Sequence, residues 1–185
     1  MRDHRPIPAD APAPDASPAA VALVLLSEPG GELEILLIRR AERADDPWSG
    51  QIALPGGRRE PEDRDLLITA IRETREETGV DLLAAEQLGA LDDLYPRTAT
   101  LPPVVVRPFV FALETRPTLV PNEEVQRAFW VPLLRLTEAS VRRDVTLTLR
   151  GAKRTFPAYV VGEDVIWGMT ERILAPFVDR IMAKL

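Results

Sequence analysis

The sequence Arg-Glu-Thr-Arg-Glu-Glu-Thr-Gly, at residues 72–79, decides how the rest of the chain is interpreted. It closes a stretch, from about residue 65 to residue 78, in which apolar or weakly polar side chains recur at steps of three and four residues: Leu67, Ala70, Ile71, Thr74 and Thr78. This spacing is the period of an α-helix, and Gly79 follows where a glycine commonly ends one. We therefore predict a helix over residues 65–78.

Three glutamates of this helix are candidate metal ligands. Because a helix advances about 100° per residue, Glu73, Glu76 and Glu77 fall within an arc of about 100° on one face, at the flank of the apolar stripe. Like charges at this spacing repel one another by a few tenths of a kcal/mol per pair unless a cation lies between them. Carboxylate oxygens suit Mg²⁺ or Mn²⁺. An acidic face that is merely solvated is the alternative, and the helix pattern alone leaves both open.

A glycine-rich turn stands before the helix. Residues 51–54, Gln-Ile-Ala-Leu, predict a short strand that stops at Pro55, Gly56 and Gly57, and a charged loop over residues 58–64 follows. Glycine backbone can approach a ligand closely because it carries no side chain. We therefore expect Gly56 and Gly57 to lie beside the carboxylates and to contact a substrate.

The remaining pattern indicates one domain rich in strands. Apolar runs at 21–26 and 33–38, separated by Gly30 and Gly31, predict a hairpin, and further strands are expected near 82–91, 104–113 and 125–131. Residues 145–149 and 155–161 predict a second hairpin, before a final helix from about 170 to 183. Residues 1–18 contain five prolines and few large apolar side chains, so we expect a disordered tail before a single domain over 19–185.

Composition excludes several classes of protein. The net charge of −6 over 185 residues disfavours a nucleic-acid binder with a basic surface. No apolar run approaches the roughly 20 residues of a membrane helix, so no membrane partner is expected. No residue is a cysteine, which excludes a thiol nucleophile and a cysteine-ligated zinc site. We expect a cytoplasmic protein with a small-molecule partner, and the sequence leaves a homodimer open.

Residues 57–80 resemble the Nudix box, whose pattern is G-x5-E-x7-R-E-U-x-E-E-x-G-U with U an apolar residue. The second half matches at Arg72, Glu73, Glu76, Glu77, Gly79 and Val80, with Thr74 at the first apolar position. The first half departs, because it is one residue longer and the usual first glutamate is replaced in the region of Glu62 and Asp63. The resemblance implies an α/β (α+β) protein of the Nudix type. We expect an α/β/α sandwich with a mixed, curved sheet, the glutamate-bearing helix on one face and the C-terminal helix on the other.

The resemblance also implies a reaction, the hydrolysis of a diphosphate linked to another moiety. Glu73, Glu76 and Glu77 would hold Mg²⁺ or Mn²⁺, and Arg72 would orient a glutamate. Glu124, after a Pro-Asn turn, is a candidate for a further ligand or a general base. This chemistry needs no serine, cysteine or histidine nucleophile, because a metal-activated water attacks.

Two upstream segments, residues 36–41 and 50–57, resemble the extra motif of the coenzyme A pyrophosphatase branch of the family. They depart from it at Ile38, at Leu54 and in the spacing from Arg40 to Gly50. This resemblance implies that the substrate is coenzyme A or acyl-coenzyme A, split into 3′-phosphoadenosine 5′-phosphate and (acyl-)phosphopantetheine. Two rivals stay open: the same chemistry on ADP-ribose or another nucleotide conjugate, and a non-catalytic Nudix-fold module that senses a ligand.

Arginines gather around the expected cleft of this acidic protein. Guanidinium groups suit phosphate oxygens, so arginines and glycines form the candidate substrate-binding set: Arg39, Arg40, Arg43, Gly56, Gly57 and Arg58. The alternative is that the arginines are ordinary surface residues of charged loops. Trp130 and Trp167 stand in apolar strand contexts, which favours core packing over stacking on a base.

Overall fold

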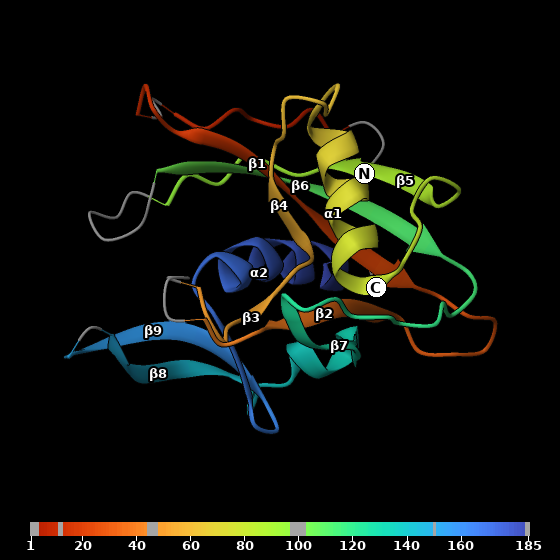
Figure 1. Cartoon of the computed structure of the whole chain (residues 1–185). Helices are drawn as coiled ribbons and strands as arrows, with labels where there is room; N and C mark the ends of the chain where they lie inside the picture. Colours follow the sequence, from red (N-terminus) through yellow and green to blue (C-terminus); the bar gives the residue numbers. More distant parts are fainter. Residues whose placement is uncertain (1–3, 11–12, 44–47, 97–102, 150, 184–185) are drawn as a thin grey trace.

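The computed structural model describes residues 4–10, 13–43, 48–96, 103–149 and 151–183. Its central strand is β1 (Ser17–Leu26), whose side chains alternate between two hydrophobic clusters. Ala20, Ala22 and Val24 pack on the side of α1 (Leu66–Thr78), whereas Leu23 and Leu25 pack on the side of α2 (Met169–Met182). The two helices cover opposite faces of the sheet (Figure 1), which confirms the predicted sandwich.

The large sheet is mixed. Its main path runs β3 (Ile52–Ala53), β2 (Glu34–Arg40), β1, β6 (Val104–Leu113) and β5 (Glu86–Ala90), while β4 (Gly56–Arg58) pairs with β1 and β7 (Val125–Pro132) pairs with β2. The β1–β6 pair is parallel and the other pairs are antiparallel. The strand predicted over 82–91 is shorter, because residues 83–85 form a turn and a bend.

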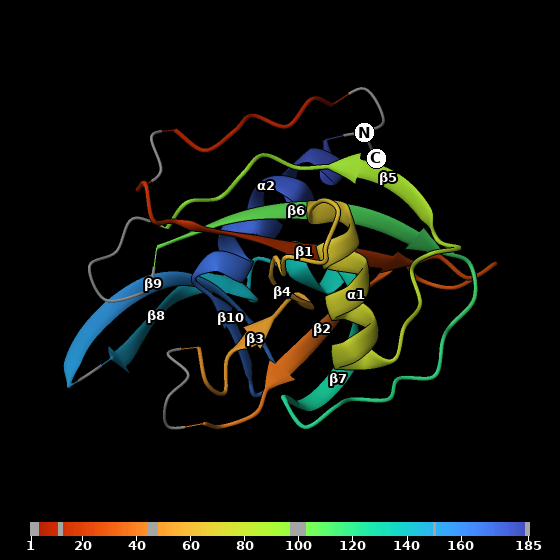
Figure 2. The same cartoon turned by 45° about the horizontal axis from the view of Figure 1, so that its top comes forward.

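A second sheet is built from the predicted hairpin and one further strand. β8 (Arg142–Leu149), β9 (Ala152–Val161) and β10 (Asp164–Trp167) pair in the order β10-β9-β8. A short 3₁₀ helix, η1 (Leu133–Thr137), precedes them, and Figure 2 shows this sheet beside the start of α2. Trp167 packs against Phe156 and Trp130 packs on the α1-side cluster, so both tryptophans have packing contacts, as predicted.

The first two strands of the large sheet diverge. β1 and β2 pair only at Leu25–Ile35 and Leu26–Glu34, as the hairpin predicted. At the other end of β1, Ala19 and Val21 pair instead with β4. The split between β1 and β2 makes room for a pocket between β4, β3 and the first turn of α2.

Helix α1 is capped at both ends by the residues that flank it. The Asp65 side chain accepts a hydrogen bond from the Ile68 backbone N–H at 3.0 Å. Gly79 adopts a φ of 75° and donates its N–H to the Arg75 carbonyl. These caps satisfy backbone groups that a helix end otherwise leaves unpaired. The predicted helix is thus confirmed, with its start one residue after Asp65.

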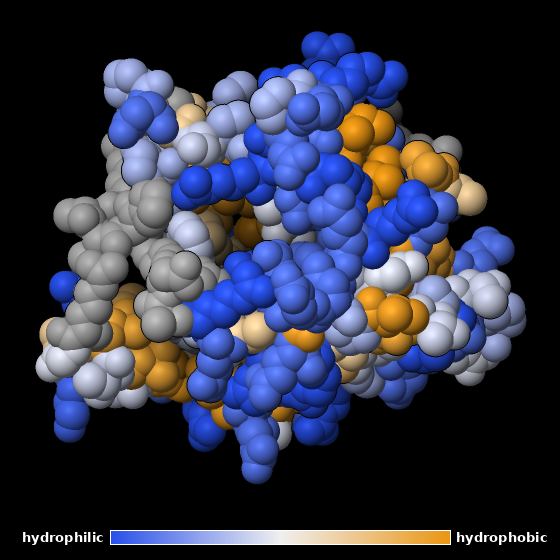
Figure 3. Space-filling view, viewed as in Figure 1, coloured by the Kyte–Doolittle hydropathy of each residue, from blue (hydrophilic) through white to orange (hydrophobic). Residues whose placement is uncertain are grey.

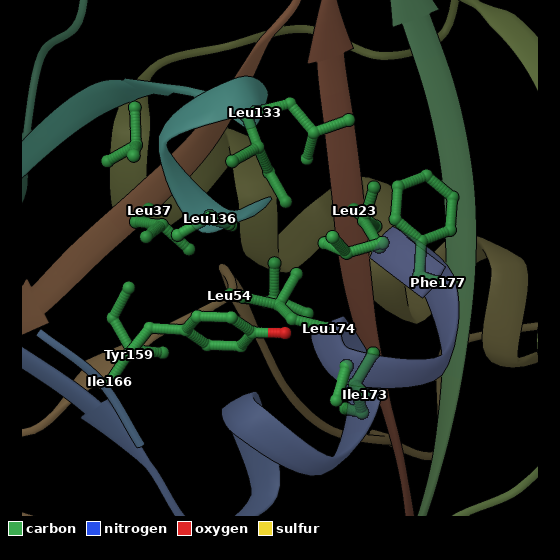
Figure 4. Close-up of a cluster of buried hydrophobic side chains, with 14 of the residues drawn as sticks. Leu23, Leu37, Leu54, Leu133, Leu136, Tyr159, Ile166, Ile173, Leu174 and Phe177 are labelled. Carbon is green, nitrogen blue, oxygen red and sulfur yellow. The ribbon is translucent and has the colours of Figure 1, made fainter. Parts of the chain in front are cut away.

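The α2 side holds the larger core. Figure 4 shows Leu23 and Leu37 of the sheet meeting Leu174 and Phe177 of α2, with the Tyr159 ring from β9 among them. These side chains are at most a few per cent exposed, which fixes the middle of α2 against the sheet.

The described part of the predicted tail contacts the β5–β6 side of the domain. The backbone N–H of Ile7 donates to Asp92, and the Asp93 N–H donates to the Ile7 carbonyl. Strand β1 already begins at Ser17. Residues 1–3 and 11–12 of that tail lie outside the described residues. Among the helices that the structure describes, none has the length and apolar character needed to cross a membrane.

Candidate active site

The pocket at the split has a volume of about 320 Å³. Figure 3 shows a hollow near the centre of this face, beside α1. Five charged residues from four segments line the pocket: Arg40, Arg58, Glu73, Glu77 and Glu124. The rest of its wall is mostly apolar and includes both glycines: Ala19, Val21, Trp48, Gln51, Ala53, Leu54, Gly56, Gly57, Val104, Val106, Met169, Thr170 and Ile173.

Two glycines let β4 pass between β1 and α1. At Gly56 a Cβ atom would lie 2.3 Å from the Ala20 carbonyl oxygen, and φ is 150°. At Gly57 a Cβ atom would lie 2.4 Å from the carboxylate of Glu73. The first clash is with backbone, which cannot move aside, and the second is with the end of a side chain, which can. Both glycines therefore lie beside the carboxylates of α1, at the position predicted for them.

We predict opposite outcomes for alanine at these two positions. Gly57→Ala should push the Glu73 carboxylate away and lower kcat/KM about tenfold or more, with little change in melting temperature. Gly56→Ala should lower the melting temperature, because its Cβ meets the backbone of β1. Steady-state kinetics and thermal melting of the two variants check this. Equal effects of both variants on stability would contradict it.

Glu77 is the most buried of the three predicted ligands, with a side chain 2% exposed. One of its oxygens accepts the Gly56 backbone N–H at 2.8 Å, and the other lies 3.6 Å from the Arg40 guanidinium. Burial raises the pKa of Glu77 to about 8, although Gly56 and Arg40 both act to lower it. The hydrogen bond from Gly56 and the charge of Arg40 thus do not offset the cost of burying the negative charge of the Glu77 carboxylate.

Glu73 lies next to Glu77 in the same pocket. Burial raises the pKa of Glu73 too, opposed mainly by Arg72, whose guanidinium is 3.1 Å from the carboxylate. Glu124 adds further negative charge facing both side chains. Two buried carboxylates with raised pKa values and a third nearby form a donor set that a hard divalent cation would stabilise.

We predict that the metal-free protein becomes less stable as the pH rises from about 4.5 to about 8. The folded-state pKa of Glu77 lies above its ordinary value of 4.5, so the folded protein holds a proton that the unfolded chain has released. Unfolding in a chelator at several pH values measures this. Glu77→Gln keeps an acceptor for the Gly56 N–H and should flatten the slope. Equal slopes for the two proteins would contradict the prediction.

Arg72 connects the loop to the helix. Its guanidinium donates to both oxygens of Asp63, at 3.0 and 2.9 Å, and to the Arg58 carbonyl at 3.2 Å. Asp63 is 3% exposed and also accepts from the Thr69 hydroxyl. The Arg72 guanidinium therefore holds the pKa of Asp63 well below its ordinary range. Glu62 is exposed, so of the two acidic residues it is Asp63 that faces the predicted arginine.

Glu76 is arranged differently from the other two glutamates. Its side chain is 53% exposed and accepts from Arg72 at 3.1 Å. Over the described ranges, no three acidic or histidine side chains stand together as a ready metal cluster. Glu73 and Glu77 fit a divalent cation by burial and charge, and Glu76, one turn away on the same face, fits as a third ligand once it leaves Arg72.

The predicted arginines occupy different places. Arg40 and Arg58 line the pocket, whereas Arg39 does not and lies opposite Arg127 in the β2–β7 pair. Arg43 lies at the rim, 3.2 Å from a carboxylate oxygen of Glu124. Two of the four predicted substrate-binding arginines thus reach the pocket wall itself.

Much of the apolar wall has no sequence pattern that marks it as part of a site. Val104 and Val106 come from β6 and Met169 from α2, and their sequence signal is that of ordinary core residues. Gln51 belongs to the predicted strand over 51–54 and Trp48 stands just before it, but no sequence pattern marks either as a residue of the pocket wall.

Comparison with known proteins agrees with the geometry. The model of the NUDIX domain family matches residues 16–149. The chain belongs to the NUDIX family. This Nudix chain is 32% identical, over 91% of its length, to a human protein named mitochondrial coenzyme A diphosphatase. The match covers 71% of the human protein.

Two further similarities extend over much of this Nudix chain. It is 39% identical, over 68% of its length, to an uncharacterized protein of Schizosaccharomyces pombe, of which the match covers 40%. The chain thus spans less than half of that relative. A MutT/nudix family protein from Enterococcus faecalis has a similar fold, with a TM-score of 0.60 over 95% of this chain and 66% of the other, at 22% identity.

Proposed function

We propose that this Nudix hydrolase cleaves the diphosphate bond of coenzyme A or acyl-coenzyme A. The products would be 3′-phosphoadenosine 5′-phosphate and phosphopantetheine or its acyl form. The observation that carries the reaction is the pocket that Glu73, the buried Glu77 and Glu124 line together with Arg40 and Arg58. The carboxylates suit a cation and the guanidinium groups suit phosphate oxygens.

In this proposal Glu73, Glu76 and Glu77 hold Mg²⁺ or Mn²⁺. When bound, such an ion offsets diphosphate charge and lowers the pKa of a water molecule. The water oxygen forms a bond to one phosphorus and the P–O bond to the bridging oxygen breaks, which separates 3′-phosphoadenosine 5′-phosphate from (acyl-)phosphopantetheine. Glu124 is the proposed acceptor of the proton from that water, since it lines the pocket and is half exposed.

The chain's other residues position these groups. Arg72 is held by Asp63 and donates a hydrogen bond to Glu76, so it orients the Glu76 side chain on α1. Gly57 leaves the space that the Glu73 carboxylate occupies. Arg40 and Arg58 would bind phosphate oxygens of the substrate, and Arg43 would restrain Glu124.

The choice of coenzyme A is supported by two separate observations. The human relative named as a coenzyme A diphosphatase matches over most of this chain. The segments 36–41 and 50–57, which resemble the motif of that branch, supply Arg40, Gln51 and Leu54 to the pocket wall.

Product chromatography of a substrate panel tests the proposal. The panel contains coenzyme A, acetyl-coenzyme A, ADP-ribose, diadenosine polyphosphates and nucleotide sugars, each with Mg²⁺ or Mn²⁺. Release of 3′-phosphoadenosine 5′-phosphate is the expected result. If only ADP-ribose or another conjugate were hydrolysed, the assignment of coenzyme A as the substrate would be overturned. Tight binding of one compound without any turnover would favour a sensing module, although all three predicted metal ligands are present.

The proposal includes a cytoplasmic location. The human relative is named as mitochondrial, so fractionation of cells that express the untagged chain is the direct test. Recovery with an organelle fraction would overturn this location. Sedimentation of the purified protein decides whether the homodimer left open by the sequence forms.

A further inference from the structure

The pocket passes around one side of β4. Gly57 pairs with Ala20, whose side chain packs on the α1 face, and Glu73 lies over that glycine. Ala19 and Val21 pair with Arg58 and Gly56 and therefore point to the opposite face. Within the described strands β4 pairs with β1 alone. The carboxylates and the Ala19–Val21 wall thus lie on opposite faces of the sheet and share one pocket.

The far wall of the pocket is aliphatic. Ala19 pairs with Val106 and Ser17 with Val104 in the parallel β1–β6 ladder, so these side chains stand on one face. Ala19, Val104 and Val106 form a small buried cluster with Val21 and Met169 packed against it. All five residues line the pocket, and we name this wall the aliphatic end: Ala19, Val21, Val104, Val106 and Met169.

Two polar side chains of the lining stand at this end: Arg58, which pairs with Ala19, and Thr170. The Thr170 hydroxyl, which also lines the pocket, donates to the Ile52 carbonyl at 3.1 Å. A second ribose with several hydroxyl groups would lose hydration here without regaining it, which disfavours such a ligand. A branched aliphatic group would instead bury its methyl groups against valine and methionine, which is favourable.

We infer that the aliphatic end binds the pantoyl group of the substrate. In coenzyme A this group follows the diphosphate directly and carries two methyl groups on one carbon. Its position beside the diphosphate matches a pocket in which the carboxylates and the aliphatic wall lie on the two sides of one strand, β4. The inference rests on the proposed function. It assigns to Val104, Val106 and Met169 the discrimination between a pantoyl arm and a sugar.

Met169 offers the most direct test. It is partly exposed and stands at the first position of α2, so we expect Met169→Ser to remove the thioether with little effect on the fold. Calorimetry with Mg²⁺ measures binding of the two product halves separately. The variant should bind 4′-phosphopantetheine about tenfold more weakly and 3′-phosphoadenosine 5′-phosphate within about twofold of the starting protein.

Two controls sharpen the result. Leu83→Ser makes the same kind of change at a side chain that is 68% exposed and outside the pocket, and it should leave both affinities unchanged. Met169→Leu keeps an aliphatic wall and should restore the binding of 4′-phosphopantetheine. Equal weakening of both halves, or of neither, overturns the pantoyl assignment while leaving the proposed function intact. Failure of the unaltered protein to hydrolyse coenzyme A overturns the proposed function itself.

Discussion

Glu76→Gln is expected to lower kcat about a thousandfold, because a metal ion contributes several kcal/mol to charge stabilisation and each 1.36 kcal/mol changes the rate tenfold. Glutamine keeps the size and the hydrogen bond to Arg72 but loses the charge that a cation needs. The melting temperature should stay nearly constant, since the Glu76 side chain is 53% exposed. Turnover measured against Mg²⁺ concentration, beside thermal melting, checks both parts.

Glu60→Gln is the matched control for this experiment. Glu60 is 58% exposed and lies 3.8 Å from the same Arg72 guanidinium, but it stands in the loop before α1 and not on the helix face that carries the three predicted ligands. The Glu60→Gln variant removes one negative charge near Arg72, as Glu76→Gln does, and should retain turnover. If the two variants lose activity equally, the effect comes from the general field around Arg72, and the assignment of Glu76 as a ligand fails. Full activity of Glu76→Gln would have the same consequence.

Asp63→Ala is expected to cost about 3 kcal/mol of unfolding free energy, because it leaves the Arg72 guanidinium without its buried partner. Asp63 is 3% exposed and accepts from Arg72, Thr69 and the Glu60 backbone N–H. For a chain of this length the melting temperature should fall by about 6–12 °C. Denaturant unfolding at neutral pH measures the loss.

Glu62→Ala tests whether the neighbouring acid shares this role. Glu62 is exposed, so its removal should change the unfolding free energy by no more than about 0.5 kcal/mol. A larger loss from Glu62→Ala than from Asp63→Ala would reverse the assignment of the outer acidic position.

Acid should remove the contribution of the Asp63–Arg72 pair. The folded-state pKa of Asp63 lies below its ordinary value of 3.8, so its stabilising effect is complete above that pH and is lost as the pH falls through the folded-state value. The difference in stability between the unaltered protein and Asp63→Ala should therefore shrink below about pH 4. A constant difference across acid pH would contradict the pairing.

The sequence is most informative where the signal is local. Helix α1 could be predicted because its apolar period, the Asp65 cap and Gly79 lie within one short stretch, and the same holds for the position of Gly56 and Gly57. The layering of the sandwich followed from the family resemblance, and the alternation along β1 provides its physical reason.

Other parts of the site depend on information that the local sequence lacks. Arg39 and Arg40 are adjacent, and only the register of β2 decides which one faces the pocket. Whether Glu62 or Asp63 turns inward depends on the path of the loop around Arg72. The aliphatic end brings together β1, β6 and α2, so its members look like unrelated core residues until the fold is known.

The pairing of β1 with β6 also affects the order in which this protein can fold during its synthesis. Ala19 and its partner Val106 are separated by roughly 90 residues, and contacts of such long range form slowly because a large loop must close first. The caps and the apolar positions of helix α1 all lie between Asp65 and Gly79, so its contacts are local and need no large loop to close. During synthesis the segment that carries the three glutamates is therefore made long before the cavity that uses it can form. The nascent chain acquires its complete pocket only after α2, which supplies Met169, Thr170 and Ile173, has left the ribosome.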